Sequence, residues 1–178
     1  MYNTNMRLFI AINFNKDTHS QLLALQDELR SMSERGRFCM PENLHLTLVF
    51  LGECNAGQAN YVKTIMDAVS FEPFDLIIDC IGRFKRNGND LWWAGVKEST
   101  ALSHLQRCLT DKLIAAGFAL EKRKYTPHIT LGREIVTDAV PKQIDSFGEM
   151  VSKIDLMKSE RVNDKLVYTV IHTKVIIK

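Results

Sequence analysis

The sequence lacks the features that mark several large classes of protein. No apolar stretch approaches the roughly 20 residues that a helix needs to cross a bilayer. The segment Met1 to Arg7 has no long apolar run after a charged start, so we expect no signal peptide. The formal net charge is only +2, so charge alone does not suggest a long duplex with many phosphates as a partner. We therefore expect a cytoplasmic protein that does not bind membranes.

Cysteine is sparse and scattered along the chain. The four cysteines stand at positions 39, 54, 80 and 108, and no two of them form a CxxC pair. This spacing matches neither a zinc knuckle nor a thioredoxin-like redox site. We expect reduced and mostly structural cysteines, as is usual in the cytosol.

A linker rich in glycine, serine or proline is also missing, so the 178 residues are expected to form a single domain, 1–178. What the sequence does contain is an alternation of short strand-like and helix-like segments. Apolar runs predict strands at 7–14, 44–51, 74–81, 91–96 and 127–133, and later ones at 154–157, 165–171 and 175–177. This order predicts an α+β domain of antiparallel or mixed sheet with helices packed outside.

Three amphipathic helices are expected between these strands. Their apolar residues recur at spacings of three and four, which gives each helix one apolar face. Asp17 is expected to cap the start of the first helix, and Gly36 to mark its end. Gly117 stands where the third helix should end.

The most informative feature is a short motif that occurs twice. The copies are Leu44-His45-Leu46-Thr47-Leu48 and Pro127-His128-Ile129-Thr130-Leu131, so each contains His-x-Thr-Leu in an apolar, strand-like run. They stand close to half the chain apart, and each follows a helix-bearing segment. The repeat predicts two similar halves that each contribute one strand to a shared cleft.

The geometry of a strand indicates which side chains of each motif lie on the same face. Successive side chains point to opposite faces, so His45 and Thr47 share one face and lie roughly 6–7 Å apart along the strand. The same holds for His128 and Thr130. The other face of each strand is apolar and can anchor the motif in a core, which gives the polar side chains rigid support.

Two such pairs suit the cleavage of a phosphodiester without a metal. The hydroxyls of Thr47 and Thr130 can donate hydrogen bonds to phosphate oxygens. His45 and His128 can act as general acid and general base from opposite sides of the phosphorus, as in-line displacement requires. A 2′,3′-cyclic phosphate fits this site because its ring is strained and its leaving ribose oxygen needs a proton. The residues alone leave open which histidine plays which role.

Other readings of the histidines stay open. His45 and His128 could be surface residues on half-exposed strands, although two accidental His-x-Thr-Leu copies are improbable. They could also bind zinc, but the sequence has neither HxxxH nor HExxH to supply a third ligand, so we expect no metal and no cofactor. His19 and His104 are expected on the surface, and His172 has no assigned role.

Several residues near the motifs could bind substrate. Arg133 follows Thr130 by three residues and could hold a phosphate at the edge of the cleft, or it could be a solvated strand end. The basic loops 83–86 and 122–124 could line a path for an RNA backbone, or could simply be solvated. Stacking on a base could involve Phe84, Trp92, Trp93 and Tyr125, although we expect at least one tryptophan to be buried.

The chain resembles a known family. The paired His-x-Thr motifs are similar to those of the 2H phosphoesterase superfamily, and more narrowly to RNA 2′,3′-cyclic phosphodiesterases, long called 2′-5′ RNA ligases. The resemblance is carried by RLFIAI at 7–12, PENLHLTLVFLGE at 41–53 and YTPHITLGR at 125–133. With the order of the helices, it covers essentially the whole chain.

The resemblance implies a bilobed fold, with two pseudo-symmetric lobes of antiparallel sheet and outer helices around a central cleft. It implies metal-independent hydrolysis of a 2′,3′-cyclic phosphate at an RNA end to a 2′-phosphomonoester, by a monomer without an obligate protein partner. In this reading His45 is the proton donor to the leaving 3′-oxygen and His128 is the proton acceptor that activates water. Thr47 and Thr130 hold the phosphate, and Arg133 and Tyr125 are further substrate-binding candidates.

The chain also departs from the family pattern. Phe38 stands where the family often has tryptophan, Met40 where it often has a basic residue, and Thr126 where it often has arginine or histidine. These changes leave the motifs intact but bear on how the nucleotide beyond the phosphate is held. Two alternatives therefore stay open: a phosphoesterase or ligase acting on 2′-5′ linkages or small cyclic nucleotides, and a non-catalytic RNA-binding module. A binding module would have no need of a general acid and base.

Overall fold

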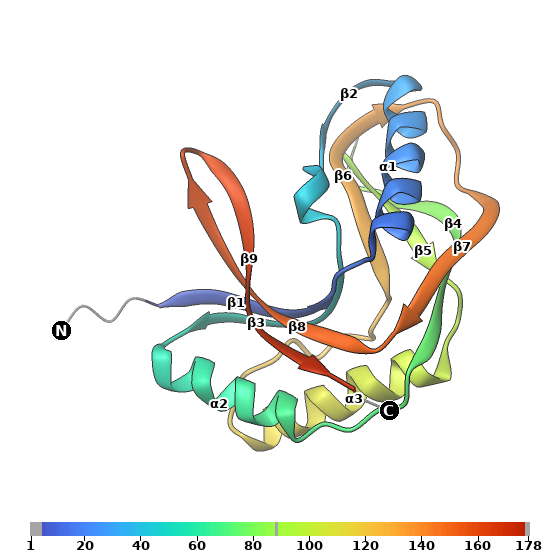
Figure 1. The fold of residues 1–178 in the computed structure, drawn as a ribbon. Coiled ribbons are helices and arrows are strands. Elements are labelled where there is room, and N and C mark those ends of the chain that lie inside the picture. Colours follow the sequence, from blue (N-terminus) through green and yellow to red (C-terminus); the bar gives the residue numbers. More distant parts are fainter. Residues whose placement is uncertain (1–4, 88, 177–178) are drawn as a thin grey trace.

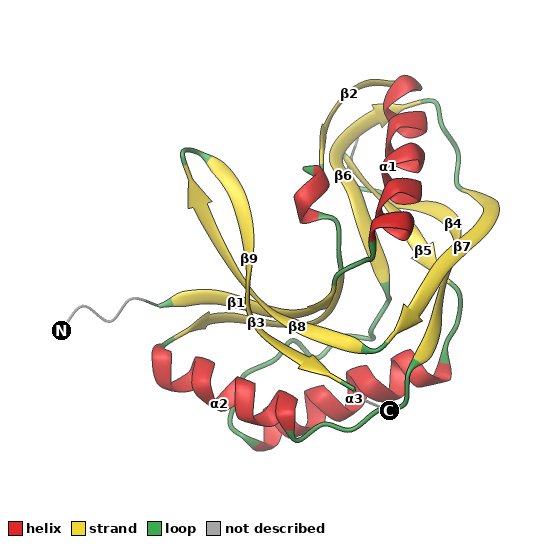
Figure 2. Cartoon of the chain, viewed as in Figure 1, coloured by secondary structure: helices red, strands yellow, loops and turns green. Residues whose placement is uncertain are grey.

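The computed structural model describes residues 5–87 and 89–176, which form two antiparallel sheets with helices packed outside (Figures 1 and 2). The expected strand 175–177 and the segment 1–7 therefore lie partly outside the described residues. No helix in the described part of the chain is long and apolar enough to span a membrane.

Each sheet is assembled from segments that are distant in the sequence. The first sheet has the order β3-β1-β8-β9, built from β1 (Met6–Ile12), β3 (Leu46–Cys54), β8 (Lys153–Val162) and β9 (Lys165–Val175). The second has the order β2-β6-β5-β4-β7, built from β2 (Ser33–Phe38), β4 (Phe74–Phe84), β5 (Asp90–Val96), β6 (His128–Thr137) and β7 (Lys142–Val151). The expected strand at residue 175 is the end of β9. The prediction of two lobes is confirmed, but they are not two halves of the sequence, because the chain passes repeatedly between the sheets.

The three long helices cover the outer faces of the sheets. α1 (Lys16–Ser31) packs against β2 and β7 of the second sheet. α2 (Ala56–Asp67) and α3 (Thr100–Ala115) pack against each other and against β3 of the first sheet, and Figure 1 shows them together on one side of the molecule.

The predicted start and end of α1 are wrong, whereas the end of α3 is confirmed. The N-cap of α1 is Asn15, whose side-chain oxygen accepts a hydrogen bond from the Thr18 amide, and Asp17 lies in the first turn. Gly36 lies inside β2, where a β-carbon would collide with the side chain of Ile135. Its small size therefore serves the close packing of β2 on β6, and not a helix end. Gly117 follows α3 with φ +89°, a left-handed conformation that favours glycine.

The apolar faces of the motif strands are anchored in the core as expected. Leu46 and Leu48 of β3 are buried, and so are Ile129 and Leu131 of β6. These side chains belong to one core cluster that extends across both sheets. The polar face of each motif is therefore supported by a packed interior, which restricts the movement of the strand that carries it.

We predict that Gly148→Ala destabilises the fold. A β-carbon at this position of β7 would collide with the backbone carbonyl oxygen of Leu76 in the paired strand β4, and backbone cannot move aside as a side chain can. The expected loss in the free energy of unfolding is about 1–3 kcal/mol, measured by urea denaturation. Gly57→Ala is the matched control, because its β-carbon would approach only the side-chain oxygen of Asn55, at 3.3 Å. The control should change stability by about 0.5 kcal/mol or less; equal stability of the two variants would contradict this account of β4–β7 packing.

Candidate active site

His45 immediately precedes β3, and both of its ring nitrogens have a neighbour. Nδ1 lies 2.7 Å from the backbone carbonyl oxygen of Asn43, and Nε2 lies 3.0 Å from Oγ1 of Thr47. A carbonyl oxygen can only accept, so Nδ1 must carry a proton. In the neutral ring Nε2 is then the basic nitrogen, and in the charged ring it is a second donor.

The backbone that orients His45 is itself fixed. Residues Pro41–Asn43 form the short 3₁₀ turn η1, and the buried Asn43 donates a hydrogen bond from Nδ2 to the carbonyl oxygen of Leu166 in β9, at 2.8 Å. His19 also holds this turn, because its Nε2 lies 2.8 Å from the carbonyl oxygen of Pro41. The expectation that His19 is simply a solvated surface residue is therefore wrong. His104, in contrast, is exposed as predicted.

His128 repeats the arrangement of His45 in the second sheet. It is the first residue of β6, and its Nδ1 lies 2.7 Å from the carbonyl oxygen of Thr126, which is again two residues earlier in the chain. The same reasoning places a proton on Nδ1 and leaves Nε2 available for chemistry. Thr130 lies two residues further along the strand, as Thr47 does in the first motif. The two copies are thus alike in structure as well as in sequence.

Aromatic side chains restrict both imidazoles. The ring centroid of His45 lies 4.9 Å from that of Phe9 and 5.2 Å from that of Tyr168. The ring of His128 is perpendicular to that of Phe84, with centroids 5.2 Å apart. Sequence reasoning missed Phe9 and Tyr168, because each reaches its histidine from another strand and nothing in the local sequence marks that contact.

Trp93 packs over two glycines, Gly82 and Gly95, on strands β4 and β5 of the sheet that carries His128. Trp93 lies opposite Thr130 in the β5–β6 pairing and packs against Phe84, with ring centroids 5.5 Å apart. A β-carbon at Gly82 or Gly95 would collide with the indole ring, so both positions must stay small for the ring to lie there. Trp92 points the other way and is fully buried. One tryptophan is therefore core, as expected, and the other lies on the motif face.

Burial lowers the pKa of both motif histidines below the ordinary value. For His45, the hydrogen bond from Nδ1 to Asn43 opposes this effect, and the charge of His128 adds to it. For His128, the hydrogen bond to Thr126 opposes it, and the guanidinium groups of Arg123 and Arg133 add to it. Strand β3 contacts β6, and the hydroxyl of Tyr125, three residues before His128, donates a hydrogen bond to the carbonyl oxygen of Thr47. The two motifs therefore lie near each other in the space where the two sheets meet.

Arg133 lies close to this space. It is exposed, and its charge opposes the burial that raises the pKa of Tyr168 in the first sheet. The β5–β6 register slips between Thr130 and Gly132, which makes Leu131 an additional residue in β6. Such a bulge re-aims the side chains that follow it, which explains why Arg133 does not enter the core beside Leu131. The phosphate-binding role of Arg133 stays a prediction.

Tyr125 ties one motif to the other. Its hydroxyl donates a hydrogen bond to the backbone carbonyl oxygen of Thr47, at 3.0 Å, and burial raises the pKa of this hydroxyl. The contact joins the segment before β6 to β3 and so helps to set the spacing between the motifs. With the hydroxyl engaged in this way, a direct contact of Tyr125 with substrate remains a prediction.

The other candidates lie apart from the motif histidines or already have partners. Arg83 forms an ion pair with Asp90 at 3.1 Å, and Arg123 forms one with Glu121 at 2.8 Å. His172 contacts Asp67 at 2.8 Å and so links β9 to α2. Within residues 5–87 and 89–176, no three His, Cys, Asp or Glu side chains are grouped so that they could hold a metal ion.

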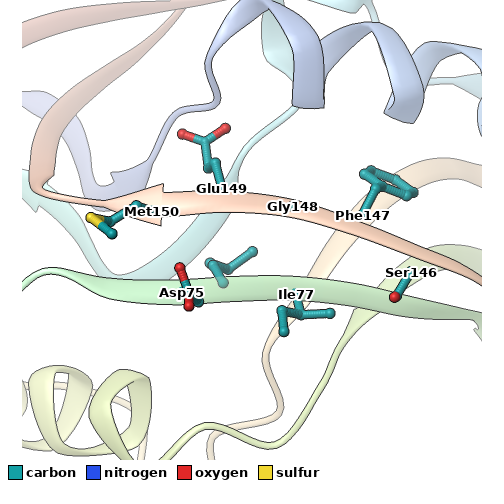
Figure 3. A pocket seen from close by; sticks show the side chains of 8 residues that line it. Asp75, Ile77, Ser146, Phe147, Gly148, Glu149 and Met150 are labelled. Atoms are coloured by element: carbon teal, nitrogen blue, oxygen red, sulfur yellow. The ribbon is translucent and has the colours of Figure 1, made fainter.

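A surface hollow of about 290 Å³ lies elsewhere, between β4 and β7 (Figure 3). Its lining includes the carboxyl groups of Asp75 and Glu149 and the apolar side chains of Ile77, Phe147 and Met150. Glu149 already accepts a hydrogen bond from the Asn15 amide, at 2.9 Å. No motif residue lines this hollow, so its size is not a reason to place the site there.

Curated proteins of similar sequence carry a consistent name. The chain is 34% identical over 152 residues to the "RNA 2′,3′-cyclic phosphodiesterase" of Archaeoglobus fulgidus, an alignment that covers 82% of this chain and 85% of the relative. It is 30% identical over 176 residues to the protein of the same name from Methanothermobacter thermautotrophicus, covering 92% and 95%.

Solved structures share the fold. LigT of Escherichia coli, in a structure with 3′-AMP, matches with a TM-score of 0.85 at 23% identity, covering 98% of this chain and 100% of that one. The protein TT0787 of Thermus thermophilus matches with a TM-score of 0.81 at 26% identity, covering 96% and 97%. A family model described as the 2′-5′ RNA ligase superfamily matches residues 19–163. The bilobed fold, the two motif strands and these matches together show that the chain belongs to the 2′-5′ RNA ligase superfamily.

Proposed function

We propose that the protein is a hydrolase that opens the 2′,3′-cyclic phosphate at the end of an RNA to give a 2′-phosphomonoester, without a metal ion. The observation that carries this proposal is the duplicated arrangement of His45 and His128. Each imidazole is fixed through Nδ1 on the backbone carbonyl two residues earlier, and each is followed by a threonine on the same strand face. The names of the relatives point to the same reaction.

The proposed step is an in-line displacement at phosphorus. Nε2 of neutral His128 accepts a proton from water, and the water oxygen attacks the phosphorus. The bond from phosphorus to the ribose 3′-oxygen breaks, and Nε2 of charged His45 gives that oxygen its proton. The product keeps its phosphate on the 2′-oxygen. Proton exchange with solvent then restores a charged His45 and a neutral His128, so the protein is unchanged after each turnover.

The surroundings of His128 suit its proposed role as the base. Burial lowers its pKa, and the charges of Arg123 and Arg133 act in the same direction. Thr47 and Thr130 provide hydroxyl donors for the non-bridging phosphate oxygens, with Oγ1 of Thr47 already 3.0 Å from Nε2 of His45. Arg133 and Tyr125 complete the proposed substrate-binding set, Arg133 through a direct contact with phosphate.

The same chemistry would serve 2′-5′ linkages or small cyclic nucleotides, so these substrates are the first alternatives. A non-catalytic RNA-binding module is the second. It is disfavoured by the matched fixing of two imidazoles through Nδ1, since binding alone requires neither a general acid nor a general base.

We also propose that the protein acts as a monomer in the cytoplasm, without an obligate protein partner. Both motifs come from one chain, so a second subunit is not needed to complete the site. The four cysteines are all free thiols, as a reducing compartment would keep them. Sedimentation equilibrium of the pure protein should give the mass of one chain, 20.4 kDa, and a stable dimer would contradict the proposal.

We predict that His45→Ala and His128→Ala each lower kcat/KM by about 10²–10⁴-fold, because each removes a proton-transfer group. The assay is hydrolysis of a short RNA ending in a 2′,3′-cyclic phosphate, in EDTA, with the 2′- and 3′-phosphate products resolved. His104→Ala is the control, because this histidine is exposed on α3 and should be dispensable. Near-full activity of either motif variant, or a strict requirement for a divalent cation, would contradict the mechanism.

The pH dependence of kcat/KM should be bell-shaped and displaced to the acidic side. The rate rises with pH as the base loses its proton and falls as the acid loses its own, and the two apparent pKa values belong to the coupled pair. Because burial lowers the pKa of both histidines, both limbs should lie below the ordinary histidine value of about 6.5. An alkaline limb well above pH 7 in the wild-type protein would disagree with this environment.

A further inference from the structure

Tyr168 packs on His45 from the β8–β9 hairpin. Its ring centroid lies 5.2 Å from that of His45 and 5.0 Å from that of Phe9, in edge-on arrangements with interplanar angles of 86° and 74°. Aromatic contacts of this kind hold ring positions through packing and through the attraction of a ring edge to a ring face. The imidazole of His45 is thus enclosed by Phe9 from β1 and by Tyr168 from β9.

The cluster around Tyr168 is separate from the main core. Phe9, Ala11 and Met157 form a small buried group on which Tyr168 packs. Ala11 lies directly opposite Thr47 in the β1–β3 pairing, so this group is on the face of the first sheet that carries the motif. Tyr168 therefore stands on the proposed active-site face and not on the face covered by the helices.

The backbone next to Tyr168 also supports His45. The carbonyl oxygen of Leu166, two residues earlier in β9, accepts the hydrogen bond from Nδ2 of Asn43, and the carbonyl oxygen of Asn43 in turn accepts from Nδ1 of His45. Strand β9 therefore restrains both the ring of His45 and the backbone group that sets its tautomer. A strand outside the two motifs thus helps to position one motif histidine.

Charged groups of both sheets influence the hydroxyl of Tyr168. Burial raises its pKa, the Cys39 thiol acts in the same direction, and Arg133 and Arg7 oppose them. The ring of Tyr168 packs on His45 on the motif face of the first sheet, so its hydroxyl belongs to the proposed active-site region. Tyr125 uses its hydroxyl to hold Thr47, whereas no hydrogen bond of the Tyr168 hydroxyl is formed among the described residues. A hydroxyl beside a motif imidazole, with its proton not engaged by the described residues, is suited to donate to an anion.

We propose that Tyr168 is a further substrate-binding and positioning residue: its hydroxyl donates a hydrogen bond to a phosphate oxygen that Arg133 also contacts, and its ring fixes the imidazole of His45. The proposal rests on the proposed function, because it takes the cyclic phosphate as the ligand. It assigns to β9 a part in the site that neither His-x-Thr motif supplies.

Two variants separate the roles of the hydroxyl and the ring. Tyr168→Phe keeps the ring, so KM for the cyclic phosphate should rise about 3–10-fold, the equivalent of one lost hydrogen bond, with kcat and the pH limbs unchanged. Tyr168→Leu removes the ring as well, so kcat should also fall. In that variant the pKa of His45 should rise toward its ordinary value, because water reaches the imidazole and relieves the burial that lowers it. Tyr61→Phe, at an exposed position of α2, is the matched control and should match the wild-type protein.

The pKa of His45 is read directly by NMR titration of its ring proton, and this readout does not depend on turnover. Inorganic phosphate supplies the binding assay, and its affinity should fall about 3–10-fold in both variants. If the wild-type protein binds phosphate but hydrolyses no cyclic phosphate, and the variants still shift the titration and the affinity, the proposed function fails and the role of Tyr168 stands. An unchanged KM and phosphate affinity in Tyr168→Phe, or an unmoved His45 titration in Tyr168→Leu, would overturn the assignment.

Discussion

The rest of the site depends on one interaction, made twice: a hydrogen bond from an imidazole Nδ1 to the backbone carbonyl two residues earlier. In both copies the distance is 2.7 Å. This bond sets the tautomer, so that Nε2 is the nitrogen available to a ligand, and it fixes the ring relative to the strand that follows. Without it a histidine at a strand end could rotate and present either nitrogen. With it, two strands of different sheets carry imidazoles that are held in the same way.

The strand topology of the fold brings the two motif strands, β3 and β6, together. The first sheet takes its strands from the two ends of the chain, whereas the second takes most of its strands from the middle, so the chain passes repeatedly between the lobes. Three side-chain contacts to backbone carbonyl oxygens then restrain the first motif. Tyr125 bonds to the carbonyl of Thr47, and His19 contacts the carbonyl of Pro41. Asn43 bonds to the carbonyl of Leu166. Each joins segments that are distant in the sequence, so the geometry of the site is a property of the whole chain.

The sequence predicted the motif strands and the bilobed sheet well because their apolar faces are regular and their polar residues are repeated. It failed where tertiary packing outweighs local pattern. Strand β2 was not predicted, because Ser33–Phe38 is polar and mostly exposed at the edge of its sheet, and β7 was missed at the opposite edge for the same reason. Gly36 resembled a helix end, but its small size serves contact with Ile135. The aromatic neighbours of the histidines could not be found from sequence either, since strand register alone brings Phe9 and Tyr168 to His45.

The central claim is that His45 and His128 act on the same phosphorus in one step. The most direct test is a double-mutant cycle, in which kcat/KM for a terminal 2′,3′-cyclic phosphate is measured for the wild-type protein, His45→Ala, His128→Ala and the double variant. Groups that act as a unit give strongly non-additive losses, because removing one already disables the step that needs both. If the two histidines act in one step, the double variant should be about as slow as the slower single variant. Losses that multiply, as for two independent sites, would contradict it.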